Sequence, residues 1–360
     1  MNMAIANKLD ANKKIGLYLA MGVVLAVLPI LIGGAFGNSW VRTLDFALLY
    51  IMLALGLNMV VGFAGLLDLG FIAFYAVGAY GYALLSSPHF GIHLPFYITI
   101  PLGALIAAFF GVLLGAPVLR LKGDYLAIVT LGFGEIVRIF INNLNAPVNI
   151  TNGPQGINLI DPVKVAGVSL GKPLEIAGYS INPVYLYYYF FLILTVLVVI
   201  MASRLQRSRI GRAWVALREN DIAAAAMGIN IRNIKLLAFA LGALSGGIAG
   251  GLFASFQGFI SPESFGLLES IMILAMIVLG GMGNIPGVIL GAVMLTLAPE
   301  FLRDVIGPVQ MATFGRMIVD PENARMLLFG LAMVVMMLIR PEGVWPSKRR
   351  QAEFKDAKKG

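Results

Sequence analysis

The sequence has no cysteine and only two histidines, His89 and His93, among its 360 residues. The lack of cysteine excludes disulfide bonds, thiol catalysis and Cys-ligated metals. The two histidines share one short loop, so we predict no metal site. The sequence also contains no Walker A loop and no nucleophile with an adjacent base. We therefore predict no catalytic residues, and we expect that this chain cannot hydrolyse ATP itself.

Charged residues are scarce as well. They make up 12% of the chain, against 59% hydrophobic residues, and the mean hydropathy is +0.88. Soluble domains carry about 25% charged residues, so this composition predicts an all-α polytopic membrane protein. The net charge of +8 raises the alternative of a nucleic-acid partner. Membrane topology explains it more simply, because the basic residues gather in expected inner loops and tails.

Long apolar runs make up most of the sequence. A helix of about 20 apolar residues crosses a bilayer, and about ten such runs are separated by polar or Gly/Pro breaks. They cover roughly residues 15–33, 43–62, 66–86, 96–118, 125–142, 184–202, 236–257, 264–280, 286–302 and 325–340. We expect the first to be an uncleaved span, since no clean small-residue cleavage pattern follows it.

Lysine and arginine are unevenly distributed between these runs. With the N-terminus inside, the inner segments hold three before the first span, two at Arg120 and Lys122, seven in 203–235 and seven from Arg340 onward, which is 19 of 26. Because basic residues concentrate in cytoplasmic loops, this distribution predicts an even span count with both termini cytoplasmic.

The same reasoning gives the domain organisation. We expect a single transmembrane domain over residues 1–346, with a long outer loop at 143–183 and an inner loop at 203–235. Residues 347–360 form a basic cytoplasmic tail.

The inner loop 203–235 contains a predicted helix at 211–228. At 100° per residue, one face of this helix is made almost entirely of small side chains, namely Ala213, Ala216, Asn220, Ala223, Ala224 and Met227. The charged residues Arg212, Arg218, Glu219 and Asp221 lie outside that face. Small side chains allow close approach, which favours docking into a partner's groove. A helix lying on the anionic membrane surface is the alternative, although the bulky residues Trp214, Val215, Leu217 and Ile222 are not gathered on one side.

Two connections between spans, around Gly62–Gly65 and around Gly280–Gly283, are short, uncharged and rich in glycine. In 62–68, Asp68 either caps the third helix or faces a water-filled cavity at membrane depth, and we predict the cap. The second connection, Gly280, Gly281, Met282, Gly283 and Asn284, predicts a helix end and a restart near Pro286. It is either a discontinuous helix that lines the path or an ordinary tight turn.

The run 236–257 carries small residues at steps of four: Gly242, Gly246, Gly250 and Ala254. Glycine lets helix backbones approach closely in lipid. This face therefore predicts tight packing against another helix, in this chain or in another.

Few ionisable residues lie inside the predicted spans. Glu135 lies near the midplane of its span, and Arg138 follows at i+3 on the same face. The two either form an internal ion pair that neutralises both charges or border a polar substrate route. Glu269, early in its span, is a second candidate with the same two readings.

Several segments resemble known permeases. Ile222-Ala223-Ala224 followed by Gly228 resembles the EAA-x3-G loop of ABC importer permeases, with Ile222 in place of Glu. The runs 115–138, 65–70, 74–80, 152–157, 211–228 and 280–284 resemble the M-type permease subunit of branched-chain amino acid ABC importers. The matches extend from about residue 45 to Pro341.

The resemblance implies an ABC importer permease fold in the bacterial inner membrane and a transport role. The implied partners are an H-type sister permease, two ATPase subunits that bind ATP and Mg²⁺, and a periplasmic substrate-binding protein. The helix 211–228 is then the ATPase-coupling helix, and this chain itself needs no cofactor. A related branch of the family carries urea or short amides, which is the alternative substrate class.

The composition agrees with a branched aliphatic amino acid as the substrate, because a large apolar interior with few fixed charges suits a small zwitterion with an apolar side chain. Two other classes of function compete. A stand-alone secondary transporter needs ion ligands near the midplane, and Glu135 alone leaves it open. An intramembrane enzyme needs paired acids, a histidine pair or a nucleophile, and ranks last.

Overall fold

The computed structural model describes residues 20, 22–118, 121, 123–165, 167–176, 179–314, 327, 330, 331, 334, 338 and 343–346. Over these residues the fold is helical, with four small two-stranded sheets. Each of the first nine predicted spans overlaps a helix in this part of the chain. The tenth, 325–340, and the basic tail 347–360 lie mostly or entirely outside the described residues.

The helices follow one another with short connections. After an apolar helix at Gly22–Phe36 come α2 (Asn38–Asn58), α3 (Ile72–Leu85), α4 (Phe96–Val118), α5 (Asp124–Asn143), α6 (Pro183–Arg207), α7 (Arg209–Glu219), α8 (Asp221–Ala226), α9 (Ile231–Gln257), α10 (Leu267–Gly280) and α11 (Ile285–Phe314). Single turns are η1 (Met59–Phe63, a π-helix), η2 (Gly153–Gln155) and η3 (Pro262–Phe265). Among the described helices, six are long and apolar enough to cross a membrane by length and composition.

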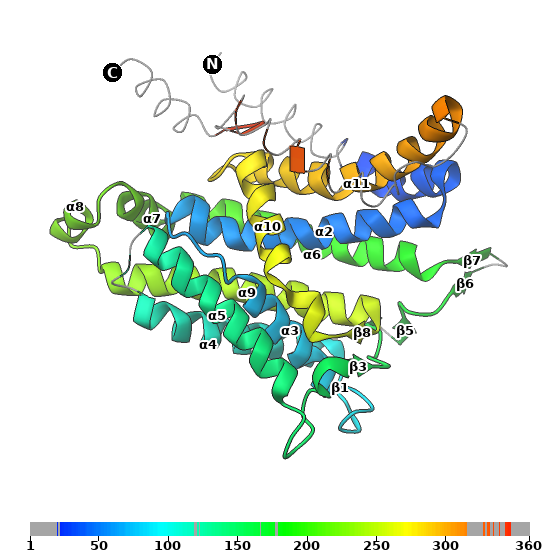
Figure 1. The fold of residues 1–360 in the computed structure, drawn as a ribbon, viewed down its shortest axis with the longest axis horizontal. Helices are drawn as coiled ribbons and strands as arrows, with labels where there is room; N and C mark the ends of the chain where they lie inside the picture. Colours follow the sequence, from blue (N-terminus) through cyan, green and yellow to red (C-terminus); the bar gives the residue numbers. More distant parts are fainter. Residues whose placement is uncertain are drawn as a thin grey trace, which may run out of the picture.

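The helix α2 is the centre of the fold. It packs against α6, α9 and α11, and nearly all of its residues from Leu48 to Asn58 are buried. A helix that is apolar on every side is stable only when other helices surround it. Figure 1 shows α2, α6 and α11 side by side in one layer, with α4, α5 and α9 in a second layer.

Glycine sets the spacing between α9 and its neighbours. A Cβ added at Gly250 would lie 2.1 Å from the carbonyl oxygen of Tyr75 in α3, and one added at Gly242 would lie 2.6 Å from the Val60 side chain. At Gly246 the nearest atoms belong to Phe71 and Phe74. The partner of the predicted packing face is therefore the α2–α3 region of the same chain.

The strands lie at the end of the molecule opposite to α7 and α8 (Figure 1). They form four antiparallel pairs: β1 (Ser86–Ser87) with β2 (Ile92–His93), β3 (Ile157–Asn158) with β8 (Phe259–Ile260), β4 (Lys164–Val165) with β5 (Val168–Ser169), and β6 (Leu174–Ile176) with β7 (Tyr179–Ile181). The β3–β8 pair joins the long loop 143–183 to the end of α9. We call this the strand end and the other the α7–α8 end.

Two predicted helices differ from the structure. The span predicted at 66–86 is helical only from Ile72, because residues 64–71 form a non-helical segment, here called the unwound stretch. The predicted cap by Asp68 is wrong: α3 has no side-chain cap, and Asp68 Oδ1 instead accepts a hydrogen bond from the Gly70 N–H. The prediction of a single helix at 211–228 is also wrong, because this segment breaks at Asn220 into two helices, α7 and α8.

Candidate functional site

The helix α7 is fixed to the membrane part of the chain by Trp214. This side chain is 0% exposed, stacks on Phe63 of η1 with ring centroids 6.5 Å apart, and donates from Nε1 to the carbonyl oxygen of Ile234 over 2.9 Å. Buried aromatic groups contribute strongly to packing. Trp214, which belongs to the predicted ATPase-coupling helix 211–228, therefore positions α7 against the rest of the chain.

The break at Asn220 turns α8 away from α7. The Asn220 side chain accepts hydrogen bonds from the N–H groups of Ile222 and Ala223, which makes it the N-cap of α8. Behind α8, Lys235 lies 3.3 Å from Asp221 and is itself 4% exposed. This partly buried ion pair, in which the Asp221 side chain is 26% exposed, holds the short helix against the start of α9.

The exposed residues of α8 and its end form an apolar surface at the tip of the α7–α8 end (Figure 1). Ile222 is 79% exposed and Met227 83%. The rest of this surface, here called the α8 surface, consists of Ala223, Ala225 and Ala226. It differs from the predicted face: Ala224 is buried at 3% exposure, and Ala213 and Ala216 are half-buried on α7. The projection failed because it assumed one helix across Asn220.

Arg212, Arg218 and Glu219 are exposed on α7, and Gly228 follows α8 with φ +81°. Arg218 has the most informative contact. Its Nη1 donates to the carbonyl oxygen of Gly62 over 2.8 Å, and its Cγ would lie 2.6 Å from a Cβ added at Gly65. The predicted ATPase-coupling residue Arg218 thus lies directly across the start of the unwound stretch.

The two glycine-rich connections meet beside Arg218. Asn58 Oδ1 accepts a hydrogen bond from the Gly283 N–H over 2.9 Å, and Gln206 Nε2 donates to the Gly283 carbonyl oxygen over 3.2 Å. A Cβ added at Gly62 would lie 2.0 Å from Asn58 Oδ1 and 2.7 Å from Gly283 N. We call Asn58, Gly62, Gln206, Arg218 and Gly283 the glycine junction. It joins α2, α6, α7 and the α10–α11 connection.

The predicted helix break lies next to this junction. The helix α10 ends at Gly280, Gly281 has φ +115° and Gly283 φ +81°, and α11 begins at Ile285. Non-glycine residues rarely adopt such backbone angles. Asn284 Nδ2 donates to the carbonyl oxygen of Trp345 over 2.7 Å, so a segment from near the end of the chain closes over the break.

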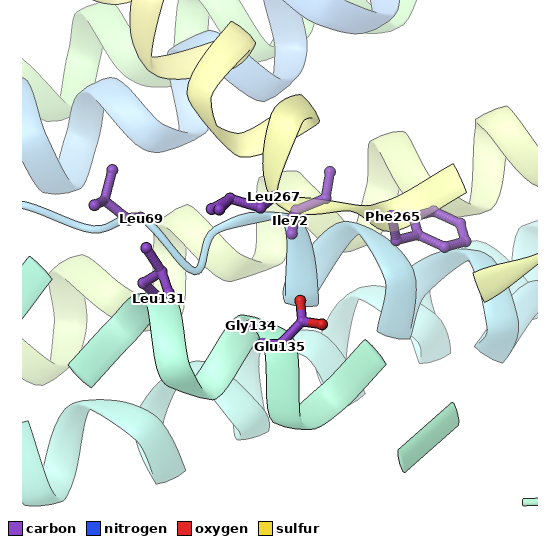
Figure 2. Close-up of a pocket in the computed structure, with 7 residues that line it drawn as sticks. All are labelled: Leu69, Ile72, Leu131, Gly134, Glu135, Phe265 and Leu267. Carbon is purple, nitrogen blue, oxygen red and sulfur yellow. The ribbon is translucent and has the colours of Figure 1, made fainter. Parts of the chain in front are cut away.

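A small pocket, with room for about one water molecule, lies between α5, the unwound stretch and the start of α10. Figure 2 shows its lining. Most of the lining is apolar, with one carboxylate, Glu135, that points from α5 toward Ile72. The other lining residues are Leu69, Ile72, Leu131, Gly134, Phe265 and Leu267.

Glu135 and Arg138 come together as their i,i+3 spacing predicts. Arg138 Nε donates to Glu135 Oε1 over 3.0 Å, and Nη2 donates to the same oxygen over 2.5 Å. The Arg138 side chain is 27% exposed and that of Glu135 39%. Arg138 Nη1 also lies 3.5 Å from Glu263 in η3, a contact that sequence reasoning missed. The guanidinium thus lies between two carboxylates, one in the pocket and one toward the strand end.

The other two candidate pathway residues are not part of this pocket lining. Asp68 is 1% exposed. Glu269 accepts a hydrogen bond from the Tyr50 hydroxyl over 2.9 Å. Sequence reasoning missed Asp45 and Asn58, both 0% exposed in α2. Asp45 lies inside a predicted span, which was a signal that could have found it. In the described part of the chain neither of its carboxylate oxygens has a hydrogen-bond partner.

No group of three or more His, Asp or Glu within the described residues could hold a metal ion. The arrangement instead offers a fixed helix with an exposed apolar tip, a junction of glycine breaks and a small pocket with one ion pair. These parts suit mechanical coupling and passage of a small solute more than bond chemistry.

Comparisons with known proteins identify similar chains. The model of the family "Branched-chain amino acid transport system / permease component" matches residues 39–337. The high-affinity branched-chain amino acid transport system permease protein LivM of Escherichia coli K12 is 43% identical over 87% of this chain and 72% of its own length. LivM of Salmonella typhimurium is 41% identical, over 92% of this chain and 76% of its own.

A second kind of permease is similar over a shorter region. The LivH permease protein of Escherichia coli K12 is 29% identical over 140 residues, which is 39% of this chain and 41% of that protein. No solved structure matches the chain.

Proposed function

The chain belongs to the family of permease components of branched-chain amino acid transport systems, and from that premise we propose how it works inside an ATP-driven importer. It is a multi-pass membrane subunit and a transport protein rather than an enzyme. It works beside a second permease subunit of the LivH kind.

The remaining parts of the importer are part of the proposal. Two ATPase subunits bind ATP and Mg²⁺, since this sequence contains no Walker A loop and needs no cofactor of its own. A periplasmic substrate-binding protein delivers the solute to the strand end. The α7–α8 end faces the cytoplasm of a bacterial cell across the inner membrane, as the seven basic residues of 203–235 favour.

The substrate is leucine, isoleucine or valine. The names of the relatives support this class. An aliphatic side chain gains from the apolar residues that dominate this chain, while a zwitterion leaving water needs partners for both of its charges.

Coupling runs from the α8 surface to the glycine junction. An ATPase docks on the exposed apolar tip of α8, and α7 transmits its movement because Trp214 fixes that helix to η1 and α9. The hydrogen bond from Arg218 to the Gly62 carbonyl oxygen, 2.8 Å long, carries the proposal. It is the contact through which a shift of α7 reaches the unwound stretch and the α10–α11 break.

Reconstitution of the whole importer tests this function. Proteoliposomes that contain both permeases and both ATPases should accumulate labelled leucine only when ATP and the binding protein are both present. Accumulation of urea and not leucine would contradict the substrate class, and uptake driven by an ion gradient without ATP would contradict the importer.

A further inference from the structure

We propose that the side of the chain formed by α5, η3 and the start of α10 is the surface on which the second permease subunit packs, and that this partner places a cationic side chain there. The inference rests on the proposed function and assigns one of its partners to a face. We call this side the α5–α10 face, and its defining residues are Glu135 and Arg138 of α5, Glu263 of η3, and Leu268 and Ile271 of α10.

The elements of this face are neighbours in the structure. The turn η3 packs against α5, and α10 follows η3 directly after Gly266. Leu267 at the start of α10 and Glu135 of α5 lie across the small pocket from each other (Figure 2). Arg138 Nη1 lies 3.5 Å from Glu263. The charged groups of α5 and η3 therefore border the start of α10.

The charged groups of this face are exposed at a depth where lipid would meet them. Glu135 lies near the middle of α5 (Asp124–Asn143), which covers the predicted span 125–142. Its side chain is 39% exposed, that of Arg138 27% and that of Glu263 76%. Charged side chains within a bilayer face protein or water rather than hydrocarbon. Lipid is therefore a poor cover for this face.

Other exposed helix surfaces suit lipid much better. The helix α4 contains no Asp, Glu, Lys or Arg, and its Leu105 and Phe109 are 61% and 64% exposed. The far side of α5 is also apolar, with Ile136 65% and Phe140 62% exposed. The uneven placement of charge thus separates a lipid side of α5 from the α5–α10 face.

The charges of the α5–α10 face do not balance. Both hydrogen bonds from Arg138 to Glu135 end on Oε1, and the third nitrogen of the same guanidinium faces Glu263. One guanidinium between two carboxylates leaves one negative charge in excess. A charge that is removed from water without a partner is costly, and interfaces place opposite charges against each other. A lysine or arginine of the partner would complete this set.

A different subunit fits this face better than a second copy of this chain. In a two-fold homodimer both copies contribute the same surface, which would bring excess negative charge to both sides. Leu268, 79% exposed, and Ile271, 47% exposed, supply the apolar centre that an interface needs. The relatives LivM and LivH are two different permease proteins, which supports a partner of the second kind.

The helix α10 also connects this face to the glycine junction. It begins at Leu267 and ends at Gly280, three positions before Gly283 of the junction. A shift of the junction therefore moves the helix that contacts the partner, so both permeases can respond to one ATPase movement.

Photo-crosslinking tests the surface, because the chain has no cysteine of its own. In vesicles that hold both permeases and both ATPases, Leu268→Cys carries a benzophenone maleimide, and Ile136→Cys, on the far side of α5, is the matched control. The unsubstituted complex, labelled in the same way, corrects for cysteines of the partners. Irradiation should join Leu268→Cys to the second permease and Ile136→Cys to lipid only. Adducts of Leu268→Cys with lipid alone, or with a second copy of this chain, would overturn the proposal.

Charge reversal at Glu263 is the second measurement. Glu263→Lys should lower the amount of second permease that co-purifies with this chain by at least about tenfold, because a cationic partner then meets a like charge. The side chain is 76% exposed, so the fold of this chain should survive the change. Glu175→Lys, exposed on the β6–β7 hairpin, should leave co-purification unchanged.

The outcomes separate this proposal from the importer function. Undiminished co-purification in Glu263→Lys would overturn the cationic contact and leave the importer standing. Absence of the second permease from the wild-type complex would overturn both.

Discussion

Glu135 and Arg138 are predicted to stabilise the fold as a pair. Replacing either residue by glutamine leaves the other charge without its partner, whereas replacing both removes the two charges together. Because both side chains are partly exposed, we expect a coupling free energy in the lower half of about 0.5–3 kcal/mol. The measurement is a thermal-stability cycle on the purified wild type, the two single variants and the double variant. Strictly additive losses would show that the pair contributes nothing to stability.

At the residue scale, sequence predicted contacts that are local and missed those that are not. The i,i+3 spacing of Glu135 and Arg138 places both on one face of any helix, so their contact followed from the sequence. Glu263 lies far along the chain, and only the packing of η3 against α5 brings it to Arg138. Asn58 was missed for the same reason, since its partner Gly283 is 225 positions away.

Among the elements, α9 depends on glycine for its approach to α3. Gly250→Ala should destabilise the protein by about 1–3 kcal/mol, because the new Cβ would lie 2.1 Å from the Tyr75 carbonyl oxygen and force a backbone shift. Gly132→Ala in α5 is the control, since nothing lies within 4 Å of its added Cβ. Thermal unfolding of the two variants in detergent checks this, and equal unfolding temperatures would contradict it.

The α8 surface should be the ATPase contact. Ala223→Glu places a charge on this exposed apolar tip, and we expect leucine uptake to fall at least about tenfold through loss of docking, with the protein still present in the membrane. Val148→Glu, exposed on the loop 143–183, should have no such effect. Uptake and co-purification of the ATPases are measured together.

Normal co-purification and uptake in Ala223→Glu would rule out α8 as the contact. Substitution of Gly228 is a poorer test, because its φ of +81° makes any side chain there strain the backbone.

At the element scale, hydropathy located the spans but not their interruptions. The stretch 64–71 is as apolar as a helix, so the periodicity of the sequence did not show that α3 begins only at Ile72. Thr130 of α5 accepts a hydrogen bond from the Leu69 N–H in this stretch, and Ser270 of α10 accepts one from the Ile72 N–H where α3 begins. No local sequence pattern contains these partners. The helical projection predicts Asn220 on one face of a continuous helix, whereas in the structure it is the N-cap of α8. Asn is one of the residues preferred at an N-cap, so the sequence allowed either role.

For the whole molecule, the uneven distribution of basic residues agrees with the arrangement of the ends. The basic segment that contains α7 and α8 lies at one end and the strands lie at the other (Figure 1). The two ends therefore differ as the proposed importer requires, in which a solute arrives at the strand end and ATP-driven movement acts at the α7–α8 end. The unwound stretch connects the glycine junction with the pocket between these ends.

The central claim is that Arg218 transmits ATPase movement to the membrane helices, and Arg218→Ala tests it most directly. Leucine uptake and ATP hydrolysis are measured in the same proteoliposomes, with Arg232→Ala as the matched control in the loop 203–235. We predict that Arg218→Ala keeps the ATPases bound and active but lowers the leucine transported per ATP at least about tenfold, while Arg232→Ala does not. An unchanged ratio of leucine to ATP in Arg218→Ala would contradict the account.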